Sequence, residues 1–524
     1  MSTSLGGQPA TGALATPHHL ATEAGIRMLR DGGTAIDAAI AAAAVLTVVY
    51  PHNVALGGDL FALIRTPDGT VRCVNASGWA PSAVDAAELR DRHGDWLPPR
   101  GADPVTVPGG VRGWEAMRGF GSRVSWSATL AAAEAVALDG VAVSPSLATH
   151  LNDVENHDLF GTEDFDRVFR PRGELLSVGE MFRQPELAAT FATLRSQGPD
   201  AFYRGQLAEQ LVAFLRSRES RFDLDDFADF QPEIQAPLQA EFGDLTVLTS
   251  PPNTQGFVLL HALRAVRDGA VDDPVGGGLG DLLRAFHRGN EFRDNRLADP
   301  RFADVELSEL PELRSAVSVP APAPPRVPRG DTVGIAAADG EGYAVSLIQS
   351  VYHAFGSGLI DPVTGVLFHN RGCGFSLDPA SPNVIAPRKR PAHTLMPAMT
   401  LRQGRVAHVL ATMGGQGQPQ ILGQILLRAL DGAGAIEAVA APRAIVGNQS
   451  GGGPDTVTVE ANLAAPAVAS IRRAGFSPEE VAPRTESLGQ ANVIFVDSTG
   501  AMTAASDPRS DGAAVVAHYP RPNP

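Results

Sequence analysis

One proline-rich segment divides this sequence into two parts with different patterns. Residues 315–330 read SAVSVPAPAPPRVPRG, with five prolines and neither a helical nor a strand period. Such a stretch is extended and solvent-accessible, and it usually links other elements. Helical patterns dominate before it, and strand patterns follow it. This order predicts a layered α+β or α/β/β/α arrangement.

The part before this segment opens with two predicted helices. Residues 19–30 are amphipathic, and Thr34 can cap a second helix with Asp37 at the capping-box position. This second helix is nearly all Ala, Ile, Val and Leu, so we expect it to be buried on all sides and to end at Pro51. Its nearly apolar run of 13 residues, 38–50, is too short to span a bilayer. Further helices are expected at residues 127–138, 206–218 and 284–297 and from residue 257.

Strand patterns dominate the part after the segment. The predicted strands there are residues 332–338, 343–349, 365–368, 398–401, 406–412, 493–496 and 501–505, and the predicted helices are 420–430 and 466–474. In the first part, strands 60–65 and 71–75 are expected to form a hairpin, and 245–249 is a further strand.

Composition narrows the class of function. The chain has 42 Lys and Arg against 58 Asp and Glu, a net charge of −16, and an acidic surface argues against a nucleic-acid partner. Cys73 and Cys373 are too few for a disulfide framework, and no CxxC or HExxH pattern points to zinc, so no metal or cofactor is expected. The N-terminus lacks a basic segment followed by an apolar one, which predicts no signal peptide, no membrane partner and a cytoplasmic location.

The main chemical candidate is the Asp331–Thr332 junction, because the sequence has no GxSxG elbow and no Walker-A loop. A Thr at the start of a buried strand is usually only a good strand former. If the bond between the two residues were cut, Thr332 would gain an α-amine with a pKa of about 7.7 beside its own hydroxyl. Nucleophile and base would then lie in one residue.

A second candidate is the glycine-rich stretch ATMGGQGQPQ at residues 411–420, between a predicted strand and a predicted helix. Gly414 and Gly415 could turn two backbone N–H groups toward a developing oxyanion near a helix N-terminus. The same glycines could instead form only the turn that joins strand to helix. The residues alone leave both interpretations open.

Several motifs then follow one another along nearly the whole chain. They are ATEAGIRMLRDGGTAIDAAIAAA and NVALGGDLF near the N-terminus, VTVPGGVRGWE at 105–115, SPPNTQGF at 250–257, GDTVGIAAADGEGYAVSLIQSVYHAFGSG at 330–358, NRGCGFSLDP at 370–379, RKRPAHTLMP at 388–397, TMGGQGQPQ at 412–420 and DPRSDGAA at 507–514. In content and order they resemble the γ-glutamyltranspeptidase family of N-terminal-nucleophile hydrolases. The resemblance implies an α+β fold, a four-layer αββα sandwich.

The resemblance also implies a cut and a nucleophile. Thr332 stands where the family has its nucleophilic Thr. Self-cleavage after Asp331 would leave a large subunit of residues 1–331 and a small subunit of residues 332–524, which would stay together as one αββα domain. The sequence does not give the quaternary state, and a homodimer of processed units is left open.

Further site residues are implied by the same resemblance. Gly414 and Gly415 match the family's oxyanion-hole glycines. Ser350 occupies the place of a Thr hydroxyl that neighbours the nucleophile's amine. His393 and Thr394 occupy the places of two Ser residues that line the acyl site.

Three departures from the family pattern bear on the substrate. Ser77 stands where the transpeptidases have an Arg for the glutamyl α-carboxylate, Gly374 where they have an acid for the α-amine, and Tyr352 where they have an Asn. Losing a charge-assisted pair typically costs about 1.5–3 kcal/mol, so we expect ordinary γ-glutamyl recognition to be poor.

Arg371, in the sequence NRGCG, is the candidate replacement. Its guanidinium could bind a substrate carboxylate in a bidentate manner, or it could be a surface residue or a structural ion-pair partner. The sequence around it resembles a divergent branch of the family that includes glutathione hydrolase-like proteins and oxamate amidohydrolases. Members of that branch cleave an amide next to a small anionic acyl group.

The resulting hypothesis is a self-processing N-terminal Thr amidohydrolase or acyltransferase, acting on a small-molecule amide through a Thr332 acyl-enzyme. The first alternative is genuine γ-glutamyl transfer or glutathione hydrolysis. The second is an unprocessed, non-catalytic binding protein. Other residues receive structural interpretations: Cys373 as a small apolar filler, His18 and His19 as surface residues, and Arg388–Arg390 as a solvated loop.

Overall fold

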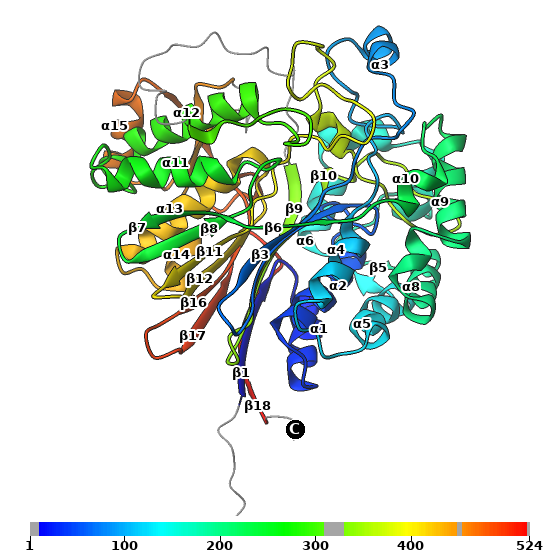
Figure 1. Ribbon diagram of the computed structural model, residues 1–524, viewed down its shortest axis with the longest axis horizontal. Coiled ribbons are helices and arrows are strands. Elements are labelled where there is room, and N and C mark those ends of the chain that lie inside the picture. The colour runs from blue at the N-terminus through cyan, green and yellow to red at the C-terminus, as the bar shows by residue number, and fades with distance from the viewer. Residues whose placement is uncertain (1–9, 309–329, 448–452, 521–524) are drawn as a thin grey trace, which may run out of the picture.

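Two β-sheets lie face to face between two layers of helices (Figure 1). The structure is a computed structural model that describes residues 10–308, 330–447 and 453–520. Most of the proline-rich segment, residues 315–329, therefore lies outside the described residues. The predicted αββα sandwich of the α+β class is confirmed.

The first sheet has seven strands in the order β18-β1-β9-β10-β2-β3-β6, all antiparallel. Their bounds are β1 Ala10–Thr16, β2 Asp59–Arg65, β3 Val71–Ala76, β6 Glu233–Gln235, β9 Gly330–Asp339, β10 Ala344–His353 and β18 Ala513–Tyr519. The hairpin β9–β10 thus lies at the centre of the sheet, between β1 and β2 from the start of the chain. The hairpin that begins near Thr332 is consequently flanked by strands from the first part of the sequence.

The second sheet has six strands in the order β17-β16-β12-β11-β8-β7. Their bounds are β7 Leu238–Phe242, β8 Leu245–Thr249, β11 Ala398–Arg402, β12 Arg405–Thr412, β16 Ala491–Val496 and β17 Met502–Ser506. The core between the sheets combines large side chains, such as Phe61 and Met399, with the alanines Ala336 and Ala338 on β9. These small side chains allow the two sheets to approach closely around β9.

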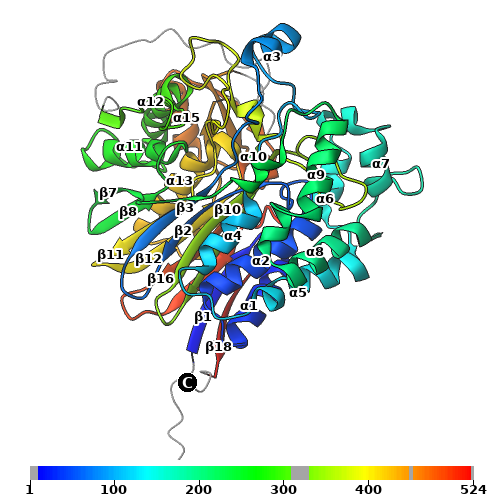
Figure 2. The same cartoon turned by 45° about the vertical axis from the view of Figure 1, so that its right-hand side comes forward.

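One helical layer covers the outer face of the first sheet (Figure 2). It contains α1 His19–Arg30, α2 Ala35–Val49, α4 Gly110–Arg118, α5 Trp126–Asp139, α6 Pro145–Leu151, α7 Glu163–Phe169, α8 Pro185–Gln197 and α9 Gln206–Ser217. The predicted capping box at the start of α2 is confirmed, and every residue of this helix is buried, as its apolar sequence predicts. Two peripheral helices are α3 Ala86–His93 and α10 Leu224–Ala228.

The other helical layer covers the second sheet and packs in a separate core. It contains α11 Gly256–Arg267, α12 Leu279–Arg296, α13 Gln418–Leu430, α14 Ala435–Ala440 and α15 Ala465–Arg473, beside a small sheet of β13 Ala444–Val446, β14 Thr456–Glu460 and β15 Ser477–Val481. A two-stranded sheet joins β4 Val141–Ala142 and β5 Met181–Phe182. Within the described ranges, no helix is both long and apolar enough to cross a membrane.

One predicted strand is wrong. Residues 365–368 form only isolated bridges, Leu367 with Ile360 and Phe368 with Gly57, because the segment turns back on itself at Gly365, whose φ is +69°. The terminal strands β1 and β18 were not predicted. The sequence of β1, ATGALAT, is short in the branched and aromatic residues that mark strands, and pairing with β9 and β18 supplies what its own sequence lacks.

Candidate active site

Thr332 lies buried near the start of β9, where the two sheets almost touch. A Cβ atom built on Gly334 would lie 2.6 Å from the backbone nitrogen of Thr412, so only glycine allows β9 to approach β12 this closely. The contact brings the turn that follows β12 alongside β9. The glycine two residues after Thr332 therefore helps to bring Thr332 and the Gly414–Gly415 turn together.

A chain of hydrogen bonds surrounds the Asp331–Thr332 peptide bond. The Thr332 hydroxyl donates to Ser350 Oγ at 3.1 Å, and Ser350 Oγ donates to the carbonyl oxygen of Asp331 at 2.6 Å. The N–H of Tyr352 donates to Ser350 Oγ at 2.8 Å across a β-bulge in β10, where Tyr352 has φ +78°. Ser350 thus connects the hydroxyl with the carbonyl that it would attack.

Asn53 adds a contact that sequence reasoning missed. Its side-chain amide donates to the carbonyl oxygen of Thr332 at 3.3 Å, from the loop that follows α2. The Asn53 side chain is buried. Its position in the NVALGGDLF motif was the available signal, since a polar residue next to a glycine turn is a common binding position.

The glycine turn after β12 fits both interpretations that the sequence left open, a strand-to-helix connection and a pair of oxyanion donors. It joins β12 to α13, and Gly414 and Gly415 have φ +138° and +51°. Neither N–H group has an acceptor among the described residues. Gln255 Nε2 donates to the Gly415 carbonyl at 2.9 Å and to the Thr394 carbonyl at 2.7 Å, and Arg293 holds Gln255 at 3.0 Å. The turn is therefore rigidly supported and retains two free donors.

Arg371 is fully buried and has no carboxylate partner among the described residues, so it is neither a surface residue nor an ion-pair partner there. Its Nη2 donates to Thr394 Oγ1 at 3.2 Å, and its Cζ lies 3.5 Å from the centre of the Tyr352 ring. Its Nη1 has no hydrogen-bond partner. Burial lowers the pKa of Arg371, as expected for a cation without a counter-ion.

A buried carboxylate, Asp59, lies next to this arginine. Asp59 accepts hydrogen bonds from His393 Nε2 at 3.1 Å and from the N–H of Gly78 at 3.1 Å, and His369 Nδ1 lies 3.5 Å away. Burial opposes its charge, but His369, His393 and Arg371 together lower the pKa of Asp59. Burial and the Arg371 charge lower the pKa of His393 to about 3, so this imidazole is neutral. Asp59 therefore acts on Arg371 only through its field and does not pair with it, because His393 and Gly78 donate to its oxygens.

A sequence model of the family described as gamma-glutamyltranspeptidase matches residues 21–517. The chain belongs to the γ-glutamyltranspeptidase family. The chain is thus an enzyme of the N-terminal-nucleophile hydrolase type, and the resemblance drawn from the motifs is confirmed.

Individual relatives agree with this assignment. The chain is 37% identical over 521 residues to the oxamate amidohydrolase proenzyme of Klebsiella pneumoniae, covering 96% of this chain and 98% of that protein. It is 36% identical over 514 residues to the glutathione hydrolase-like YwrD proenzyme of Bacillus subtilis, covering 95% of this chain and 97% of that protein. The solved cephalosporin acylase from Bacillus halodurans superposes with a TM-score of 0.88 at 31% identity, covering 98% of this chain and 97% of that protein.

Two of the three departures from the γ-glutamyltranspeptidase pattern, Ser77 and Gly374, have local structural counterparts. The Ser77 hydroxyl donates to Asn75 and accepts from Asn253, so a neutral polar network holds this side chain. A Cβ atom on Gly374 would lie 3.8 Å from Arg371 Nη1. The same Cβ atom would meet the carbonyl oxygen of Ala392 at 2.8 Å, and glycine leaves Arg371 Nη1 unpaired.

The segment Arg388–Arg390 is not the solvated loop that we expected. Lys389 and Arg390 are buried, and Arg390 pairs with Glu233 and donates to the Ser77 carbonyl at 2.9 Å. The prediction was wrong because an acidic partner from a distant strand, β6, neutralises the charge. His18 is likewise buried, where its side chain caps α1 by accepting from the N–H of Leu20.

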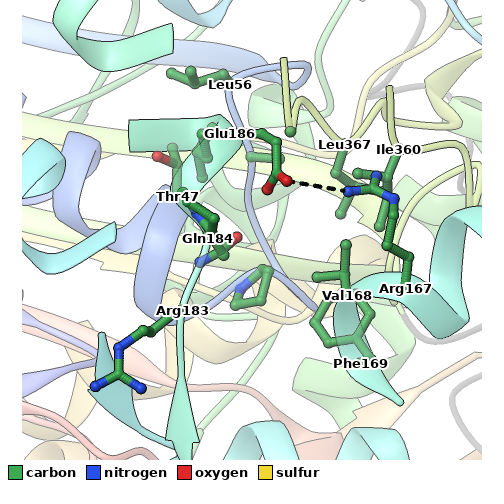
Figure 3. Close-up of a pocket in the computed structure, with 15 residues that line it drawn as sticks. Thr47, Leu56, Arg167, Val168, Phe169, Arg183, Gln184, Glu186, Ile360 and Leu367 are labelled. Atoms are coloured by element: carbon green, nitrogen blue, oxygen red, sulfur yellow. Dashed lines mark ion pairs between the residues drawn. The ribbon is translucent and has the colours of Figure 1, made fainter. Parts of the chain in front are cut away.

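A hollow on the helical side of the molecule lies apart from these residues (Figure 3). It is lined by α2, α7 and α8 and by the segment around Leu367, and Arg167 faces Glu186 across it at 4.0 Å. Its lining includes neither Thr332 nor Arg371 nor the glycine pair. The predicted site residues are instead closed off: Thr332, Ser350, Tyr352, Arg371, His393 and Thr394 are all buried.

Proposed function

We propose that this chain cuts itself between Asp331 and Thr332 and then hydrolyses amides of small anionic acyl groups through a Thr332 acyl-enzyme. The observation that carries the proposal is the hydrogen-bond chain from the Thr332 hydroxyl through Ser350 to the Asp331 carbonyl. Relatives that are named proenzymes support processing of the chain.

The self-cleavage step follows from this geometry. Thr332 Oγ1 attacks the Asp331 carbonyl carbon, and the Ser350 hydroxyl, which already donates to the carbonyl oxygen, stabilises the charge that develops there. The new O–C bond forms, the C–N bond breaks, and the hydroxyl proton ends on the Thr332 amine. Water then hydrolyses the ester, which leaves the α-carboxylate of Asp331 and a free N-terminal Thr332.

In turnover, the freed amine is the base that takes the proton of the Thr332 hydroxyl. The hydroxyl oxygen attacks the substrate amide, and the N–H groups of Gly414 and Gly415 stabilise the tetrahedral oxyanion. The intermediate collapses to an acyl-enzyme as the amine leaves. Water, or an acceptor amine, then releases the acyl group from Thr332.

Arg371 defines the proposed substrate class. A buried guanidinium without a carboxylate partner is costly, and a substrate carboxylate would supply the missing counter-charge. The free Nη1 faces the position of Gly374, and Thr394 fixes Nη2. We therefore assign Arg371, Thr394, His393 and Tyr352 to the acyl-binding site, with the carboxylate of the acyl group on Arg371.

The structure gives less support to γ-glutamyl substrates. A glutamyl group also carries an α-amine, which needs an acceptor. Gly374 offers no acid, and the nearby Asp59 already accepts from His393 and Gly78. Oxamate-like and glutaryl-like amides, which have a carboxylate but no amine, suit these residues better.

Intact mass spectrometry on the purified wild-type chain tests the proposal first. Two pieces that divide between Asp331 and Thr332 are expected, and both should remain in one particle on size exclusion. The processed protein is then assayed with oxamate, glutaryl amides and γ-glutamyl amides. A single 54.7 kDa species that is stable for days would refute the proposed function and favour a non-catalytic relative.

A further inference from the structure

A cluster of titratable side chains around His150 lies next to the side chain of Asp331, and His150 takes no part in the mechanism described above. His150 on α6 points its Nε2 at the side chain of Asp331, 3.5 Å from Oδ1. Both side chains are mostly buried. The residue on the carboxyl side of the proposed cut is thus held by its side chain as well as by its carbonyl and by pairing with Tyr352.

The hydrogen bonds of His150 define its protonation state. Its Nδ1 lies 2.9 Å from the carbonyl oxygen of Ser146, which can only accept, so Nδ1 must carry a proton. If the ring were neutral, Nε2 would then present a lone pair to the Asp331 carboxylate. Only the doubly protonated imidazolium places a donor there. The geometry therefore favours a protonated His150 that donates from Nε2 toward the Asp331 side chain.

The neighbouring His52 shows the opposite state. Its ring centre lies 4.4 Å from that of His150, and its Nε2 contacts Ser146 Oγ at 3.1 Å. Ser146 Oγ donates to Glu486 at 2.8 Å, so it accepts from His52 Nε2. His52 Nδ1 has no partner. Burial and the His150 charge lower the pKa of His52, so this ring stays neutral.

The surrounding charges favour the proton on His150. Asp331 on β9 and Glu486, 4.0 Å from His150 Nδ1, are the acids that face it, and Asp511 lies beyond them, bound to Tyr50 and to the N–H of Ser146. Burial by itself would lower the pKa of His150, but Asp331 and Glu486 raise it to about 9. The imidazolium therefore persists at neutral pH.

We propose that protonated His150 is a positioning residue for self-cleavage: it anchors the Asp331 side chain and so holds the scissile carbonyl in line with the Thr332 hydroxyl. This inference rests on the proposed function, because it concerns the cut between these two residues. An anchored side chain leaves the carbonyl little freedom to rotate away from Ser350, and such restraint is a large part of intramolecular rate enhancement. His150 touches neither Thr332 nor the acyl site, so turnover by the processed enzyme does not depend on it.

The sign of the pH effect follows from the charge of His150. The anchor is complete below a pKa of about 9 and is lost as the pH rises through this value. Self-cleavage of the wild type should therefore slow above pH 9. A variant without the imidazole should be slow at every pH and should lack this alkaline decline.

The test measures self-cleavage of chains made by cell-free translation and transferred to buffers from pH 6 to pH 10, with the fraction cut followed by intact mass. The variants are His150→Gln, Asp331→Asn and the double variant, with the exposed His157→Gln as a matched control. We expect each single variant to be cut at least tenfold more slowly at pH 7, and the double variant to be no slower than the slower single one. His157→Gln should behave like the wild type.

The kinetic constants of the processed fraction separate positioning from general damage. Once cut, His150→Gln should hydrolyse its substrate with kcat and KM within twofold of the wild type. Asp331→Asn probes the same contact if His150→Gln does not fold. Wild-type rates and pH profiles in both variants would overturn the role of His150 and leave the proposed function standing. A wild-type chain that is never cut at this bond would instead overturn the proposed function, and the role of His150 with it.

Discussion

Replacing Arg371 by Met gives the sharpest test of the substrate class. Met fills the buried space beside Tyr352 without the charge, so the variant removes the carboxylate partner and relieves the burial of an unpaired cation. A charge-assisted hydrogen bond contributes about 1.5–3 kcal/mol, and a bidentate carboxylate would use two. After the cost of desolvating the carboxylate, the net contribution of Arg371 to transition-state binding is about 3 kcal/mol, which corresponds to a factor of about 150 in kcat/KM.

The assay compares oxamate with oxamide, which differ only in the exchange of a carboxylate for a neutral amide of similar shape. The quantity of interest is the ratio of the two kcat/KM values, because damage to the nucleophile or to the oxyanion hole cancels in it. The wild type should prefer the anion, and Arg371→Met should lower this preference about 150-fold. Thr394→Ser, which keeps the hydroxyl that accepts from Arg371 Nη2, should retain it. An unchanged ratio in Arg371→Met would show that the carboxylate binds elsewhere.

Three further predictions follow from the same geometry. Thr332→Ala should remain one chain of 54.7 kDa by intact mass, and a cut at the same bond would rule out Thr332 as the attacking group. Gly414→Ala should lower kcat at least about a hundredfold, because a Cβ atom there would lie 2.4 Å from Ile421 and the φ of Gly414 is +138°. The control variant Gly404→Ala, at φ +77° in open space, should keep the wild-type kcat. Equal losses of kcat in both variants would argue against an oxyanion role for Gly414. In the uncut Thr332→Ala chain, the raised pKa of His150 should contribute its full stabilisation to the free energy of unfolding below pH 6.5. This contribution should fall by up to about 3 kcal/mol by pH 9, as measured by urea unfolding at each pH. If His150→Gln does not flatten this pH profile, the linkage is refuted.

Local signals in the sequence were read correctly where neighbouring residues decide the structure. Thr34 and Asp37 form the predicted capping box because both bonds close within one turn of helix. Helix α1 and strand β8 have the predicted bounds, since their own side chains carry the period that packing requires. The strand predicted at 365–368 failed because a short apolar run does not distinguish a strand from a buried loop.

Parts of the site lay beyond this kind of reasoning. Asn53 and Asp59 lie in the NVALGGDLF motif and His150 carries no marking pattern, but each of the three acquires its partner from a distant segment. Charge patterning also misled, because Arg388–Arg390 reads as a solvated run until Glu233 is placed beside Arg390. A single sequence contains the charges but not the distances between them.

The sequence by itself determined the family, the four-layer fold class and the position of the candidate nucleophile, because ordered motifs and local periodicity are properties of the chain. Only the tertiary structure decided that Arg371 is buried without a counter-ion, that Asp59 is shared between two histidines and that His150 faces Asp331. The physical reason is that burial and pairing set the energy of a charge, and both depend on which distant segments the packed sheets bring together.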